Sequence, residues 1–147
     1  MAEDYLLPTR RAVLPRLKHD ADLLTLIPAA SQYPGTVPAT RTSPFLRMGS
    51  FIGSPFRASG LDSSAIRFSV QGFTNDLKNG AGAVTASAED QIHRIGSAIK
   101  NALDDATLTL ESGLKLRIAW IQTSPGVDRD EAGAWMTTVT FRAEVAG

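Results

Sequence analysis

Two histidines are the first side chains in this sequence that could do chemistry, as metal ligands or as general acids and bases. His19 stands beside Asp20 and Asp22, but the spacing matches no established zinc-ligand pattern. We therefore interpret His19 as an exposed residue at a helix end, where the helix dipole favours a cation. His93 falls off the apolar side of a predicted helix. That position indicates solvent exposure or a contact between subunits, with catalysis as the alternative.

An acidic motif in the last third of the chain resembles the start of a calcium-binding loop. Asp128, Arg129 and Asp130 supply alternating acidic residues, but an EF-hand loop then requires further oxygen ligands at set positions. The sequence has Ala132 and Val139 at those positions. The segment is therefore interpreted as a solvated hairpin loop, and neither a metal nor any other cofactor is predicted.

A nucleophile motif is also incomplete. Ser97 and Lys100 fit the S-x-x-K pattern of penicillin-binding proteins, but the S-D-N and K-T-G motifs that accompany it do not occur. Phosphate-binding glycine motifs are missing as well. The sequence contains no cysteine, which excludes thiolate nucleophiles, disulfides and cysteine metal ligands. We predict a protein without a catalytic set, although a small enzyme or ligand-binding domain stays open as an alternative.

Charged residues in two segments are candidates for binding a partner instead. Arginines recur at Arg41, Arg47, Arg57 and Arg67, with the aromatic residues Phe45, Phe51 and Phe56 among them. Such arginines can simply cover the solvated face of a sheet, but arginine with aromatic residues is also typical of interface cores. The candidate interface residues are Arg41, Arg47, Arg57, Asp128, Arg129, Asp130 and Glu131.

Period-two and helical patterns define the elements that must position these residues. An apolar stripe at helical spacing predicts one long helix over 85–103, with Ser87 and Asp90 as a capping box. Alternating apolar and polar residues predict strands over 45–52, 65–74, 114–122 and 134–145. Near the N-terminus, Pro15 means that the first helix either starts near Leu14 or is kinked, and Asp20 is expected to cap a helix over 21–27.

The segments between these elements are rich in proline, glycine and serine. Residues 28–44 are predicted to be a long loop, 53–64 an irregular stretch, 75–82 a turn and 126–133 a charged loop. Within the strands, Met48, Ile52, Trp120 and Trp135 are interpreted as core residues. One of the two tryptophans is alternatively an interface anchor, because burying the indole N–H requires a partner.

Composition limits the classes of protein that fit. The 147 residues suit a single domain over 1–147 and contain 15 Lys+Arg against 15 Asp+Glu. Nucleic-acid binding through phosphates usually shows a basic excess, so the balance disfavours it. No apolar run is long enough to span a bilayer, the N-terminal residues do not resemble a secretory signal, and no membrane partner is predicted. We expect an α+β fold: a mostly antiparallel sheet of about four strands, with the long helix and the short N-terminal helices on one face.

The order of the elements, with several short motifs, resembles the DUF3168 family of tailed-phage proteins, the tail-completion or tail-terminator group. The motifs are D-A-x-L-x-x-L at 20–26, I-x-F-x-V-x-x-F at Ile66, Phe68, Val70 and Phe73, Ala102-Leu103 closing the long helix, and W-x-x-x-V-x-F-R-A from Trp135 to Ala143. The resemblance covers nearly the whole chain. The segments 28–44 and 53–64 are bulkier than the family pattern.

The resemblance implies a structural protein of the virion neck, assembled in the host cytoplasm. Members form a hexameric ring at the head-proximal end of the tail tube, stop tube polymerisation and meet the head–tail connector or stopper protein. DNA passes through the bore without sequence-specific binding. The implied partners are copies of the chain itself, the tail-tube protein and the connector. Our hypothesis is that the segments 28–44, 53–64 and 127–132 make the tube or connector contacts. A connector stopper or a tail-tube subunit is the alternative.

Overall fold

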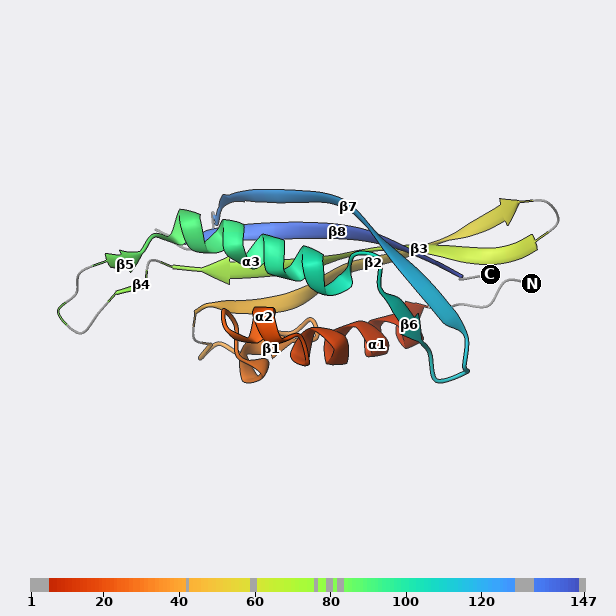
Figure 1. The fold of residues 1–147 in the computed structure, drawn as a ribbon, viewed down its shortest axis with the longest axis horizontal. Coiled ribbons are helices and arrows are strands. Elements are labelled where there is room, and N and C mark those ends of the chain that lie inside the picture. Colours follow the sequence, from red (N-terminus) through yellow and green to blue (C-terminus); the bar gives the residue numbers. More distant parts are fainter. Residues whose placement is uncertain are drawn as a thin grey trace.

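The computed structural model describes residues 6–41, 43–58, 61–75, 77–78, 81, 84–128 and 134–145. A curled, mostly antiparallel sheet of six strands, in the order β1-β2-β3-β8-β7-β6, carries the helices on one face (Figure 1). Its strands are β1 (Gln32–Tyr33), β2 (Phe45–Ala58), β3 (Leu61–Thr74), β6 (Thr107–Thr109), β7 (Lys115–Val127) and β8 (Trp135–Val145). A separate pair is formed by β4 (Leu77–Lys78) and β5 (Val84–Ala86). The helices are α1 (Leu6–Lys18), α2 (Ala21–Leu24), the short 3-10 turn η1 (Ala29–Ser31) and α3 (Ala88–Leu103).

The long helix α3 begins at Ala88 rather than at residue 85, because residues 84–86 form β5, and it ends at Leu103 as predicted. Ser87 is the N-cap, and its Oγ accepts a hydrogen bond from the backbone N–H of Asp90 at 3.2 Å. Two acidic residues follow the helix, where its dipole disfavours them. Both act on β7: Asp104 accepts from the backbone N–H of Trp120 at 2.9 Å, and Asp105 pairs with Arg117. The hydrogen bond and the charge of Asp105 raise the pKa of Arg117.

Helix α3 packs on the sheet through close backbone approaches. Ile92, Ile95 and Ile99 are fully buried on its sheet-facing side. A Cβ added at Gly72 of β3 would lie 2.6 Å from the Cγ2 of Ile95, and one added at Gly96 would lie 3.2 Å from Thr123 of β7. Glycine at these two positions therefore lets the helix lie directly against the strands.

The N-terminal helices differ from the prediction in their limits. Helix α1 includes Pro15 and extends well before it, so a helix beginning near Leu14 is wrong. Asp20 caps α2 as predicted, accepting from the backbone N–H of Leu23 at 2.9 Å. The α-helix ends at Leu24 rather than at Ile27, and the chain continues as a turn.

The sheet has six strands rather than the predicted four, because β1 and β6 are added to it. In addition, β2, β3 and β7 extend into segments that were expected to be irregular. Strands β2 and β3 stay paired to Ala58↔Leu61, so the irregular stretch predicted over 53–64 is mostly β-hairpin. Strand β7 does not end at Gln122 but continues through Pro125 to Val127. The loop predicted over 28–44 contains β1, which pairs in parallel with β2.

A β-bulge in β2 changes which side chains face the helices. The register shifts between Met48 and Phe51, so two residues of β2 lie opposite one residue of β3. Phe51 consequently faces the helices and stacks on Phe68, whereas Ile52 points to the other face and is 59% exposed. The prediction of Ile52 as a core residue is therefore wrong.

The aromatic row continues across the sheet to its far edge. Phe68 stacks on Phe141 at 5.3 Å between ring centroids, and Trp120 lies opposite Phe141 in the register. Phe68 and Phe141 are buried, but Trp120 is 38% exposed. Met48 is buried and Trp135 packs against the core as predicted, whereas the core assignment of Trp120 is wrong.

Candidate functional site

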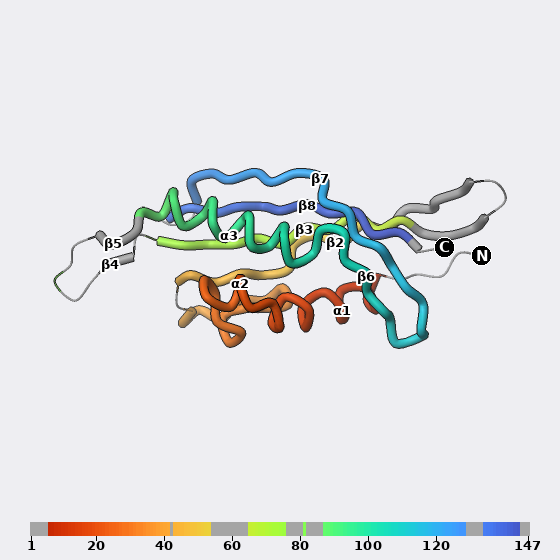
Figure 2. Tube along the Cα trace, viewed as in Figure 1, coloured from red at the N-terminus to blue at the C-terminus, as the bar shows by residue number. Residues whose placement is uncertain are grey.

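The structure brings together some of the predicted interface residues and separates others. Phe45, Phe73 and Met136 lie in one row of the sheet, which ends at Gly126 of β7. The segment carrying Arg41 and Arg47 therefore lies at the same end of the sheet as Asp128 (Figure 2). Arg57 lies at the opposite end of β2, where its backbone is opposite that of Asp62 in the strand register. Arg129, Asp130 and Glu131 lie outside the described residues.

Arg41 and Arg47 belong to an arginine–aromatic cluster that also contains Tyr33, Phe45 and Phe73. The two phenylalanine rings stack at 4.8 Å between centroids, and Tyr33 meets Phe45 edge-on at 6.2 Å. The Arg41 guanidinium lies 5.2 Å from the Phe45 ring centroid, and that of Arg47 lies 5.3 Å from Phe73. Such cation–π contacts hold the guanidinium groups in place over the rings.

This cluster lies on the face of the sheet away from the helices. Leu46 and Gly72 face the helices, so their neighbours Phe45, Arg47 and Phe73 point to the opposite face because side chains alternate along a strand. Phe45 is only 4% exposed and Phe73 only 9% exposed. The Nε of Arg47 donates to the Oε1 of Gln71 at 2.7 Å. The cluster is thus a small second core whose cover is made by arginines.

Asp128 is not the solvated loop residue that the sequence suggested. It is 9% exposed, and its backbone N–H donates to the carbonyl oxygen of Ala134 at 2.9 Å. This bond closes the β7–β8 hairpin immediately beyond Val127. Asp128 is therefore part of the hairpin framework.

The sequence interpretation missed the second half of β7 as a surface feature. Trp120, Ile121 and Val127 are exposed there, at 38%, 37% and 59%. The Nζ of Lys100 lies 4.1 Å from the Trp120 ring centroid, and the indole Nε1 donates to the Oγ1 of Thr123 at 2.9 Å. The signal that could have revealed this surface is the uncharged run from Ile118 to Val127.

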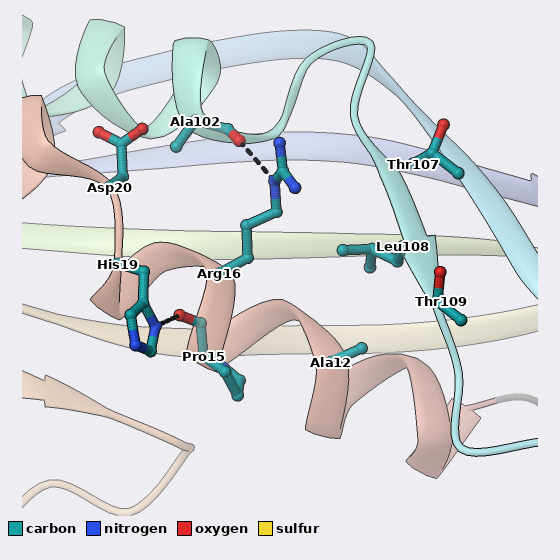
Figure 3. Close-up of a pocket in the computed structure, with 9 residues that line it drawn as sticks. All are labelled: Ala12, Pro15, Arg16, His19, Asp20, Ala102, Thr107, Leu108 and Thr109. Atoms are coloured by element: carbon teal, nitrogen blue, oxygen red, sulfur yellow. Dashed lines mark hydrogen bonds between the residues drawn. The ribbon is translucent and has the colours of Figure 1, made fainter. Parts of the chain in front are cut away.

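Two open hollows lie on the described part of the chain. One, of about 520 Å³, lies between α1, the end of α3 and β6 (Figure 3). There the Nε of Arg16 donates to the carbonyl oxygen of Ala102 at 3.2 Å, and the Nδ1 of His19 lies 2.7 Å from the carbonyl oxygen of Pro15. His19 is exposed at the helix end as predicted.

The second hollow, of about 470 Å³, lies between α2 and α3 and includes His93 and Ser97. Both side chains are exposed, and the ammonium group of Lys100 is directed to Trp120. Among the described residues, no three His, Asp or Glu side chains are grouped so that they could hold a metal ion. No helix in this part of the chain has the length and apolar character needed to cross a membrane.

The described part of the chain is a sheet with helices on one face and an arginine–aromatic cluster on the other. The comparisons with known proteins identify its family. The tail completion protein gp17 family matches residues 11–146, and the chain belongs to this family. The tail-completion group expected from the sequence is therefore confirmed.

Solved structures share the fold at low sequence identity. A chain from the virion of a native gene transfer agent particle superposes with a TM-score of 0.72 and 19% identity, covering 94% of each chain. A second solved structure, of a protein without a descriptive name, has a TM-score of 0.52 and 16% identity, and covers 95% of this chain and 94% of that chain. No curated protein matches the sequence.

Proposed function

We propose that this protein is the tail terminator of a phage-type particle. It forms a hexameric ring on the head-proximal end of the tail tube, stops tube polymerisation and joins the tail to the connector or stopper protein, while DNA passes through the bore. The observation that carries the proposal is the family match over residues 11–146. The function is performed by assembly in the neck of the virion, after synthesis in the host cytoplasm, and requires no catalytic residue or cofactor.

The arginine–aromatic cluster supports a contact with a neighbouring virion protein at its end of the sheet. Arg41 is exposed and rests on a buried ring, so its charge is presented in a fixed place. The β7–β8 hairpin closes at the same end, and Arg129, Asp130 and Glu131 follow Asp128 in the sequence. A surface with arginines on aromatic rings beside a charged hairpin suits a partner with acidic groups at its rim. Arg57, at the other end of β2, is assigned to a separate contact.

Removing the protein from particle assembly tests the function. The expected result is separate heads and tails, with tail tubes of irregular length in negative-stain images, restored by supplying the protein in trans. Tubes of normal, uniform length that fail only to join heads would instead indicate a connector stopper. Absence of tubes altogether would indicate a tail-tube subunit, and normal particles would contradict all three roles.

The purified protein provides an independent test of the same proposal. A terminator should close into single rings, whereas a tube subunit should stack its rings into tubes. Light scattering should give the mass of a hexamer, and images of the same sample should show single rings, formed alone or when tail tubes are added. Continuous stacking, or failure to bind to tube ends, would contradict the terminator role.

A further inference from the structure

The strand β7 has two different halves. Its first residues are paired on both sides, since β6 pairs with Lys115–Arg117 and the N–H of Ile118 donates to the carbonyl oxygen of Ala106. From Ala119 to Val127, the strand has β8 on one side, and in the described part of the chain β6 does not extend along the other. Figure 1 shows this part of β7 as the outermost strand of the sheet.

The open half of β7 has only part of the usual protection of an exposed edge. Natural edge strands are commonly short, charged, bulged or covered, since free backbone groups would otherwise pair with another chain. The ten residues from Ile118 to Val127 contain no Asp, Glu, Lys or Arg, and Trp120, Ile121 and Val127 are exposed. The bulge near Ile121 and the proline at Pro125 are the only edge features of this segment.

The backbone of this half directs hydrogen-bonding groups outward. Ile118 bonds to the β6 side and the N–H of Trp120 donates to Asp104, so both point away from β8. Because successive residues alternate and the bulge adds one residue, Thr123, Pro125 and Val127 point outward beyond it. Pro125 thus has its missing N–H on the open side, where a strand tolerates proline. The remaining N–H and C=O groups can still pair with an added strand.

The side chain of Trp120 is ordered by contacts within the chain. Its ring is fixed by the Lys100 ammonium at 4.1 Å, its indole N–H by Thr123 and its backbone N–H by Asp104. A partly exposed tryptophan that is already ordered loses little conformational entropy on binding, and such residues dominate interface energies. The open edge therefore carries an aromatic anchor as well as free backbone groups.

The other side of the sheet offers a matching edge. Strand β1 pairs with β2 only as far as Arg47, and beyond it β2 has β3 as its paired neighbour among the described residues. Because of the bulge, the side chain of Ile52 in this strand lies on the face of the sheet away from the helices, where it is 59% exposed. The exposed large apolar side chains of the described residues are Leu7, Ile52, Trp120, Ile121 and Val127. All except Leu7 lie on β2 or β7, so the exposed apolar surface is concentrated on the two open-edge strands.

We propose that the open edge of β7 binds the open edge of β2 in a second copy of this chain, so that the sheet continues from one subunit into the next. Two different edges meeting head to tail give a heterologous contact, which is the kind that closes into a ring. This inference rests on the proposed function and names the surfaces that build its ring.

Cross-linking tests the pairing directly, because the chain has no native cysteine. A variant carrying both Ile121→Cys and Ile52→Cys is treated with a short bismaleimide, in rings or in assembled particles. We expect a ladder of covalent oligomers that ends at the ring size, and little cross-linking from either single variant. A single variant Ile121→Cys that gives abundant dimers would instead show β7 pairing with β7. Rings that form but show no ladder would overturn the inference and leave the terminator role intact.

A charge placed on the edge tests its importance for assembly. Ile121→Lys adds a residue that natural edge strands tolerate, so we expect an unchanged melting midpoint with at least a tenfold loss of ring formation. Asn101→Lys, which adds the same charge at an exposed position of α3, is the matched control and should assemble normally. Normal assembly of Ile121→Lys would contradict the inference. Failure of wild-type protein to self-associate even in particles would contradict the proposed ring itself.

Discussion

The two faces of the sheet bury aromatic residues in different ways. On the helix side, Phe51, Phe68 and Phe141 stack in a row beneath a continuous apolar core. On the opposite side, Phe45 and Phe73 are also buried, but their cover consists of Tyr33, Arg41 and Arg47. The helix side is closed by elements of the same chain. The other side is closed by long side chains that water or a partner can displace.

This difference separates the requirements of folding from those of assembly. Fully buried aromatic and aliphatic side chains supply most of the folding free energy, and their truncation leaves cavities. Arginine side chains over rings contribute little to stability, yet they present charge in a defined place. We therefore expect substitutions on the helix side to act on stability and substitutions on the other side to act on partner binding. The predictions below test that division, beginning with the largest effect.

Truncating the central aromatic row should have the largest effect on stability. Phe141→Ala removes a fully buried ring that stacks on Phe68, and we expect a loss of about 3–5 kcal/mol in the free energy of unfolding. Thr140→Ala, the next residue of β8 on the opposite face, is the control and should change it by roughly 0.5 kcal/mol or less. Urea denaturation followed by tryptophan fluorescence measures both. Equal effects from the two variants would remove the distinction between the faces.

Adding one methyl group between α3 and β3 should have the next largest effect. In Gly72→Ala the new Cβ would lie 2.6 Å from Ile95 Cγ2, a contact with a fully buried residue. Overpacking of this kind costs about 1–3 kcal/mol. The matched control is Gly126→Ala, where the added Cβ meets no atom within 4 Å. A calorimetric melting midpoint that falls for Gly72→Ala but not for Gly126→Ala would agree with the prediction.

Loss of the α3 cap should be smaller. Ser87→Ala removes the hydroxyl that accepts from the N–H of Asp90, and helix caps of this type contribute about 1 kcal/mol. Ser97→Ala, on the exposed surface of the same helix, should instead be neutral or slightly stabilising because alanine favours helix. Chemical denaturation of the two variants measures the contrast. Indistinguishable midpoints would mean that the cap bond contributes nothing to stability.

Substitutions on the face of the sheet away from the helices should have the smallest effect on stability. They should have the largest effect on the joining of heads to tails. Arg47→Ala removes one cation–π contact with Phe73, a loss of roughly 0.5–1 kcal/mol. Head–tail joining in complemented lysates should nevertheless fall severalfold, because the fixed charge is lost. Arg67→Ala, an exposed arginine of the same face outside the cluster, should join normally. Equal joining by both variants would argue against a partner at the cluster.

Local sequence patterns predicted the elements whose side chains bury one continuous face. The isoleucine stripe of α3, the capping residues Ser87 and Asp20, and the alternation of β8 all reappear in the structure. The extension of β2 and β3 was not predictable in the same way, because the serine, proline and glycine residues of 53–64 are typical of a loop. Pairing with a neighbouring strand makes the same residues extended. Tertiary hydrogen bonding overrode a weak local preference.

The candidate interface was predictable only in part. Arginine mixed with aromatic residues did indicate the cluster at Arg41, Arg47 and Phe45, which alternation then places on one face. Phe51 could not be distinguished from these, because the bulge that turns it to the helix side leaves no clear signal in the sequence. Trp120 was assigned to the core because its spacing continues that of Leu116 and Ile118, but it is 38% exposed and the residue of α3 that lies over its ring is Lys100 rather than an apolar one.

Because of the bulge in β2, the number of residues between Met48 and Phe51 decides which later side chains of the strand lie on the outer face. Because β2 gains one position relative to β3 between Met48 and Phe51, a natural insertion or deletion there would exchange the sides of every later residue in the strand. Relatives that differ by one residue at this point would exchange the side chains that face the helices with those that face the opposite side. An alignment of family sequences should therefore allow a one-residue gap inside this strand, between Met48 and Phe51.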